Sequence, residues 1–234
     1  MNSIQKTARI TGLLILIMAA LAAFSMAYVP TTLIVPGDAA TTANQIVAAE
    51  ELFRLGMVGD MAIFLIEIAL CALLYVLLKP VSQTLSLIAA FARLAMTIIQ
   101  GINLLNHLVV LLLLSDAGYL ASFAPEQLQA LVLLLLNAHE STVLIWGVAF
   151  GLHLLLAGYL VYQSGYLPRL VGGLLIVAAL CYFTQSFGNL LFPQSKELFT
   201  SIGLLSIVEI VLPLWLIVKG VNVAAWQKRA LATA

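Results

Sequence analysis

Six long apolar runs, separated by polar and turn-forming residues, constrain this chain more than any other feature. They cover residues 10–29, 55–78, 85–114, 128–162, 170–191 and 199–218. Only helices and closed barrels satisfy every backbone amide inside hydrocarbon, and these runs are far longer than the alternating ~10-residue segments of a barrel. Since ~20 apolar residues cross a bilayer as a helix, the pattern predicts an all-α polytopic bundle of six transmembrane helices.

The composition excludes a water-soluble globule. Hydrophobic residues make up 63% of the 234 residues and charged residues 9%, whereas soluble domains are ~25% charged. We therefore expect one integral membrane domain over residues 1–234, with the lipid bilayer as its main partner. The formal net charge of +0 leaves no basic excess for nucleic acid, and no pattern predicts an oligomeric state.

The charges between the runs predict the orientation of the chain. In a six-crossing arrangement one side receives most of the basic residues, namely Lys6, Arg9, Lys79, Arg169, Lys219, Lys228 and Arg229. Basic segments stay cytoplasmic, so both termini are expected inside a bacterial cytoplasmic (inner) membrane. A cleaved signal peptide is the alternative interpretation of the first run, and it would leave five spans.

The third and fourth runs are longer than a ~30 Å hydrocarbon core requires. We expect these helices either to tilt strongly or to project together beyond the outer leaflet. The loop before the second run predicts a short helix near residues 41–54, with an apolar stripe of Ile46, Val47, Leu52 and Phe53. That helix would lie on the projecting hairpin and cover its apolar surface.

Ionisable side chains inside the runs are the candidates for function. A charged group at mid-bilayer costs ~2.5–3.5 kcal/mol on the insertion scale and usually faces a partner or a water-filled cavity. At 1.5 Å per residue, one set lies about 14–18 Å from the inner end of its runs. This set is Glu67, Arg93, His153 and Glu209. An arginine among two carboxylates at one level would neutralise them, so we expect one site between helices two, three, four and six.

A second polar set lies nearer the outer side. It comprises Asp60, Gln100, Asn103, His107, His139, Glu140, Gln185 and Asn189. The two sets together predict a polar cavity that is closed on the inside and open outward. Its predicted binding residues are Asp60, Glu67, Arg93, Gln100, Asn103, His107, His139, Glu140, His153 and Glu209.

Structural interpretations of the same residues stay open. Arg93 could extend to the inner headgroups if the third helix begins late. The Asn and Gln side chains could form interhelical hydrogen bonds worth ~0.6 kcal/mol each. His153 could be a hydrogen-bonded core histidine.

Sequence motifs offer no catalytic, metal or cofactor site. There is no P-loop, dinucleotide fingerprint or zinc-ligand cluster, and His139-Glu140 lacks the second histidine of a metalloprotease. His139 and His153 share a helix face at a spacing that would suit axial ligation of stacked haems. The chain contains three histidines in all, which leaves that ligand set incomplete, so we predict no cofactor.

Several segments carry a resemblance to a known family. They include the first outer loop, Leu33-Ile-Val-Pro-Gly-Asp-Ala-Ala, and the stretch from Gly151-Leu-His to Gly165-Tyr-Leu-Pro-Arg. In these segments the chain is similar to a bacterial multi-pass membrane family known as domain of unknown function 4386. The resemblance implies an inner-membrane protein of about six helices. It implies no substrate, cofactor or catalytic residue.

The sequence therefore supports three functional hypotheses. The first is a membrane protein that binds or moves a small solute or proton through the deep polar site. The second is a membrane-embedded enzyme acting on a lipid or isoprenoid, with Asp60, His107, His139 and Glu140 as acid–base groups. The third is a structural or regulatory subunit whose polar residues hold helices together.

Overall fold

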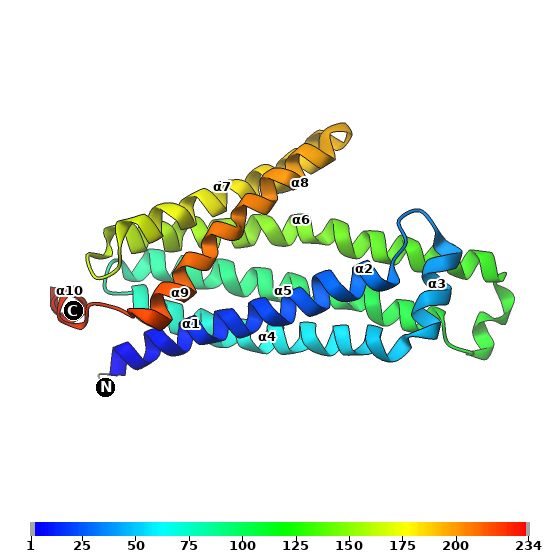
Figure 1. Cartoon of the computed structure of the whole chain (residues 1–234), viewed down its shortest axis with the longest axis horizontal. Helices are drawn as coiled ribbons and strands as arrows, with labels where there is room; N and C mark the ends of the chain where they lie inside the picture. The colour runs from blue at the N-terminus through cyan, green and yellow to red at the C-terminus, as the bar shows by residue number, and fades with distance from the viewer. Residues whose placement is uncertain (1–2, 233–234) are drawn as a thin grey trace. The chain divides into compact units, whose positions relative to one another are not determined.

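Helices form every regular element of the part of the chain that the computed structural model describes, residues 3–232 (Figure 1). Six of them are long and apolar enough to cross a membrane: Ser3–Leu33, Glu50–Leu78, Gln83–Leu113, Pro125–Ser164, Arg169–Leu191 and Pro193–Val218. The predicted all-α bundle of six spans is confirmed. Both chain ends lie outside the described residues, so their cytoplasmic location stays a prediction.

The spanning helices present large apolar side chains outward. Leu65, Phe91, Ile102, Ile145 and Leu190 are each at least 60% exposed. Soluble monomers rarely expose contiguous apolar patches larger than a few hundred Å². The exposed side chains fit contact with lipid, and the chain is a multi-pass membrane protein.

Four spans are single helices and two are composite. The single helices are α4 (Glu50–Leu78), α5 (Gln83–Leu113), α6 (Pro125–Ser164) and α7 (Arg169–Leu191). The first span passes from α1 (Ser3–Ala22) through the π-helical segment η1 (Ala23–Tyr28) into α2 (Val29–Leu33). The sixth span comprises η3 (Pro193–Ser195), α8 (Lys196–Leu204), the 3₁₀ segment η4 (Leu205–Ile210) and α9 (Val211–Val218) (Figure 1). The shorter elements are α3 (Ala39–Ala48), η2 (Gly118–Ser122) and α10 (Val223–Ala232).

A proline explains why the sixth span changes its winding in the middle. Pro213 lacks the N–H that would bond the carbonyl of Glu209 one turn earlier. Glu209 belongs to the 3₁₀ segment that ends at Ile210. In a 3₁₀ helix each carbonyl accepts from the N–H three residues later instead of four. Glu209 therefore sits on a locally irregular part of a membrane helix.

The described residues divide into two compact units. The first unit contains the described residues up to Ile17, Ile66–Ile98 and those from Leu144 onward, and the second contains Met18–Leu65 and Ile99–Val143. Leu77, Met96, Leu160, Leu175 and Leu216 are among the buried core residues of the first unit. The core of the second unit includes Leu33, Ile46, Val110, Val132 and Leu136.

The short outer-loop helix exists, but its predicted bounds were wrong. The Asp38 carboxylate accepts hydrogen bonds from the Thr41 backbone amide at 2.9 Å and its hydroxyl at 2.7 Å, which starts α3 directly after the turn. The Thr41 hydroxyl and then the Thr41 amide hold the pKa of the Asp38 carboxyl below its usual value. The helix ends at Ala48, and Glu50 already begins α4, because the backbone leaves the helical conformation at Ala49.

The predicted apolar stripe on this segment is also corrected. Ile46 and Phe53 are buried in the core of the second unit beside Val110 and Val132, whereas Val47 is 55% exposed. The interruption at Ala49 changes the helix direction between Val47 and Phe53, so a single helical period does not relate them. The packing of α3 on α5 and α6 nevertheless follows the expectation that a short helix covers that hairpin.

The turn between α6 and α7 closes the C-terminal end of α4. Gly165 adopts a φ of +73°, which favours glycine, and the following Tyr166 is buried. The Tyr166 hydroxyl donates to the Leu77 carbonyl at 2.7 Å, and the Trp226 indole N–H donates to the same oxygen at 3.0 Å. A terminal helix carbonyl needs such partners because its own helix supplies none. The Gly165-Tyr-Leu-Pro-Arg motif is thus a structural turn.

Candidate functional site

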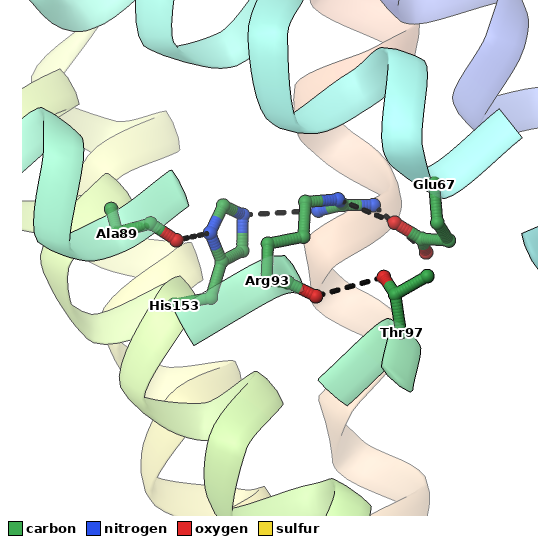
Figure 2. Close-up of polar contacts among 5 residues, drawn as sticks. All are labelled: Glu67, Ala89, Arg93, Thr97 and His153. Atoms are coloured by element: carbon green, nitrogen blue, oxygen red, sulfur yellow. Dashed lines mark hydrogen bonds and ion pairs between the residues drawn. The ribbon is translucent and has the colours of Figure 1, made fainter. Parts of the chain in front are cut away.

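Three ionisable side chains from three spanning helices meet in the first compact unit (Figure 2). The Arg93 guanidinium on α5 donates from Nε to Oε2 of Glu67 on α4 at 2.6 Å, and from Nη2 to Oε1 at 3.1 Å. Its Nη1 lies 3.0 Å from Nε2 of His153 on α6. The two parallel hydrogen bonds between Arg93 and Glu67 form a bidentate ion pair, a strong geometry for an arginine and a carboxylate. Arg93 is therefore held from both sides.

The hydrogen bonds of His153 fix its protonation. Nδ1 lies 2.8 Å from the carbonyl oxygen of Ala89, which only accepts, so Nδ1 carries the proton. Nε2 faces an arginine N–H, which only donates, so Nε2 offers its lone pair. The imidazole is neutral, and the charges of Glu67 and Arg93 balance within the group.

All three side chains are buried. Arg93 is 3% exposed, Glu67 is 5% exposed and His153 is 2% exposed. The burial of Arg93 contradicts the structural interpretation that its side chain extends to the headgroups. Its guanidinium also lies 5.7 Å from the centroid of the Phe150 ring, a distance typical of a cation–π contact.

Glu209 lies in a neighbouring pair rather than in the arginine cluster. Its Oε1 accepts a hydrogen bond from the Tyr182 hydroxyl at 3.1 Å. The Tyr182 and Phe150 rings are in edge contact with centroids 5.0 Å apart, so Phe150 touches both groups. Among residues 3–232 no direct ion pair joins Glu209 to Arg93. The shared depth of the four residues along their helices did not predict that Glu209 would bond to Tyr182 instead of Arg93.

The second compact unit holds its own polar contacts. The Ser25 hydroxyl on η1 donates to Oδ1 of Asp60 on α4 at 2.6 Å. His107 on α5 and His139 on α6 stack with ring centroids 3.9 Å apart. The Asn103 amide donates to the His139 carbonyl at 3.0 Å. Gln100 is 7% exposed, so it also faces the protein.

The outer polar set is distributed over both compact units. Gln185 and Asn189 belong to the first unit, where the Asn189 amide donates to the Thr200 hydroxyl at 3.3 Å. The Glu140 side chain is exposed. Asp60, Gln100, Asn103, His107 and His139 belong to the second unit.

Four participants were missed from the sequence, three of them without any signal. Ser25, Phe150 and Tyr182 are common residues in apolar runs, and the Ala89 oxygen belongs to the backbone. Their role follows from which helix faces meet, which the hydropathy pattern does not contain. Tyr182 had a weak signal, since a buried tyrosine hydroxyl needs a partner.

Metal binding receives no support from the grouping of ligands. Within residues 3–232 no three His, Cys, Asp or Glu side chains gather as a metal ion would require.

Comparison with known proteins gives a family. Residues 10–220 match the model of a family described as a domain of unknown function, DUF4386. The chain belongs to this family. An uncharacterised protein of the archaeon Archaeoglobus fulgidus is a relative of this DUF4386 chain, with 25% identity over 167 residues, covering 70% of this chain and 83% of that protein. No solved structure matches.

Family membership confirms the resemblance but assigns no activity. The two most specific motifs of this DUF4386 chain lie at Asp38, which caps α3, and at Tyr166, which caps α4. Both have structural roles. The buried polar contacts inside the spans are therefore the remaining candidates for function.

Proposed function

We propose that this chain is a protein of the prokaryotic cytoplasmic membrane, with both termini cytoplasmic, that binds and moves a proton or small solute through the polar site at Glu67, Arg93, His153 and Glu209. The observation that carries the proposal is the chain of contacts from Glu67 through Arg93 to His153, which crosses three spanning helices inside apolar sequence. Helix insertion needs no ionisable side chain, and each one costs ~2.5–3.5 kcal/mol at mid-bilayer. Three such groups in contact therefore favour a functional role.

Arg93 has capacity beyond its present partners. A guanidinium carries five N–H donors, and the bonds to Glu67 and His153 use three of them. In this proposal the remaining two donors would bind an acceptor atom of a small solute. A proton that binds to Glu67 would free further donors of Arg93, because a neutral carboxyl no longer forms an ion pair with the guanidinium.

Glu209 supplies the second proton acceptor of the proposal. Its described partner is the hydroxyl of Tyr182, a neutral group, so its charge is not cancelled by direct contact. It lies on the 3₁₀ segment of the sixth span, and 3₁₀ stretches inside helices often mark hinges. Protonation of Glu209 would remove the charge that opposes movement of that segment within the bilayer.

The test is proton flux into liposomes that contain the purified protein and a pH-sensitive dye, driven by a potassium diffusion potential. We expect flux above that of empty liposomes, and loss of that flux in the double variant E67Q/E209Q. The single variant E209Q, which leaves the Arg93 ion pair intact, should lose most of it. The matched control is E126Q, because Glu126 is an exposed glutamate at the start of α6.

Two results would overturn the proposal. One is no flux from the wild-type protein, and the other is unchanged flux in the double variant. If both variants fold, shown by gel filtration and circular dichroism, but flux is unaffected, the buried groups hold helices together and protons take another route. A folded wild-type protein without flux would instead favour a structural subunit.

A further inference from the structure

The second compact unit contains a small, mostly apolar pocket whose lining includes two ionisable side chains, Asp60 and His107. Ser25, Phe53, Asp60 and His107 are among the residues that line it, and the cavity measures about 10 Å³. The pocket therefore has room for about one water molecule.

We propose that Asp60 and His107 form a second proton-exchange site in which one cavity water carries the proton between them. The site does not depend on the function proposed for the arginine cluster. Its parts are a buried carboxyl, a hydroxyl that donates to it, a water-sized cavity and an imidazole that also lines the cavity.

The backbone of the first span is built for this contact. A π-helical segment inserts an extra residue into a helix and is frequent at functional sites. η1 carries Ser25, whose Cβ would lie 3.2 Å from a Cβ placed on Gly59 of α4. Gly59 therefore allows the two helices to approach, and the approach lets the Ser25 hydroxyl donate to Asp60 at 2.6 Å.

The surroundings of Asp60 favour a bound proton. The residue is 2% exposed, and the ion pairs among the described residues involve other carboxylates, those of Glu50 and Glu67. An ionised carboxylate without a cation is expensive in an apolar medium, and such a group takes up a proton instead. Ser25 and Pro30 face the pocket from the first span and neither titrates.

The histidines provide the second proton acceptor. His107 lines the pocket from α5, and its ring stacks on His139 of α6 at 3.9 Å. Nδ1 of His139 lies 3.3 Å from the Asn103 carbonyl oxygen, an acceptor, so this nitrogen carries hydrogen and the ring is oriented. Two stacked imidazoles repel when both are charged, so the pair holds at most one proton at a time.

The proton transfer balances without any further reactant. The Asp60 carboxyl gives its proton to the cavity water, and the water gives a different proton to a ring nitrogen of His107. The products are a carboxylate and an imidazolium, and no covalent bond other than O–H and N–H bonds changes. The reverse transfer restores the neutral pair.

The test is infrared spectroscopy of the protein in lipid at neutral pH, in the region where protonated carboxyl groups absorb. We expect a protonated-carboxyl band in the wild type that is lost in D60N and shifted in S25A, which removes the hydroxyl that donates to Asp60. The matched control D116N should keep the band, because Asp116 is exposed in the loop after α5. In H107F the band should remain, while its shift on transfer to deuterated water becomes at least tenfold slower.

The outcomes separate this proposal from the function proposed above. A D60N spectrum equal to that of the wild type would overturn the bound proton at Asp60. Unchanged deuterium exchange in H107F would overturn the role of His107. Glu209 also carries a partly buried carboxyl, but the difference between the D60N and wild-type spectra isolates Asp60, so the flux experiment and this one succeed or fail independently.

Discussion

The ion pair of Glu67 and Arg93 yields a quantitative prediction, because both partners are nearly inaccessible. Replacing either one with Met leaves the other charge buried and uncompensated, which costs ~3–5 kcal/mol. The double variant E67M/R93M removes both charges together. It leaves Nε2 of His153 without its donor, which costs ~1–3 kcal/mol. Since the two single variants sum to ~6–10 kcal/mol, the coupling free energy is at least ~3 kcal/mol.

The assay is reversible unfolding in mixed micelles by titration with a denaturing detergent, followed by the fluorescence of the three tryptophans. A membrane hydrogen bond without full charges contributes ~0.6 kcal/mol on average. The coupling free energy therefore distinguishes a buried ion pair from an ordinary hydrogen bond. E126M is the matched control and should unfold as the wild type does, since Glu126 is exposed. A double variant as unstable as the sum of the single variants would refute the reasoning.

Two further predictions concern the helix contacts and the outer loop. A Cβ on Gly172 would lie 2.5 Å from the backbone nitrogen of Tyr162, so G172A should destabilise the protein by ~1–3 kcal/mol. Gly173 has open space around it, so G173A should be neutral or stabilise the protein by ~0.5–1 kcal/mol. The same detergent titration checks both variants. The Asp38 carboxyl, whose pKa is lowered by its hydrogen bonds from Thr41, stabilises α3 above its unfolded pKa and loses this effect as the pH falls below ~4 through the folded pKa. The protection of the α3 amides against hydrogen exchange, measured relative to their intrinsic rates at each pH, should therefore fall in acid. D38A should show that loss of protection already at neutral pH, while D38N does not.

Hydropathy predicted the spans because lipid imposes its requirement residue by residue. The end of α4 at Leu78 and that of α7 at Leu191 coincide with the ends of their apolar runs. The first span, in contrast, begins at Ser3 and includes Lys6 and Arg9, because a helix continues into polar sequence as long as its backbone stays bonded. Hydropathy therefore predicts the membrane-embedded part of a helix better than its ends.

The candidate site was predictable in depth but not in direction. Residue spacing gives the level of a side chain along its helix, and this level brought Glu67, Arg93 and His153 into one group. It does not give the rotation of one helix against another, which places Phe150 in contact with both Arg93 and Tyr182. Glu209 therefore pairs with Tyr182 instead of with Arg93.

Ser25 was unpredictable for a different reason. A serine in an apolar run has little insertion cost and so attracts no attention beside Asp60 or Glu67. Its orientation toward Asp60 depends on the π-helical winding of η1. A local change of backbone winding leaves the hydropathy pattern almost unchanged, and the sequence had no means of signalling it.

The fixed imidazole of His153 makes a bond deep in the bilayer observable. Nitrogen magnetic resonance distinguishes a bare ring nitrogen from one that bears hydrogen, and with three histidines in the chain single substitutions suffice to assign every signal. The resonance of the bare nitrogen beside Arg93 then acts as a reporter. Its movement during turnover would reveal whether the guanidinium leaves its place, without a label or a probe in the lipid.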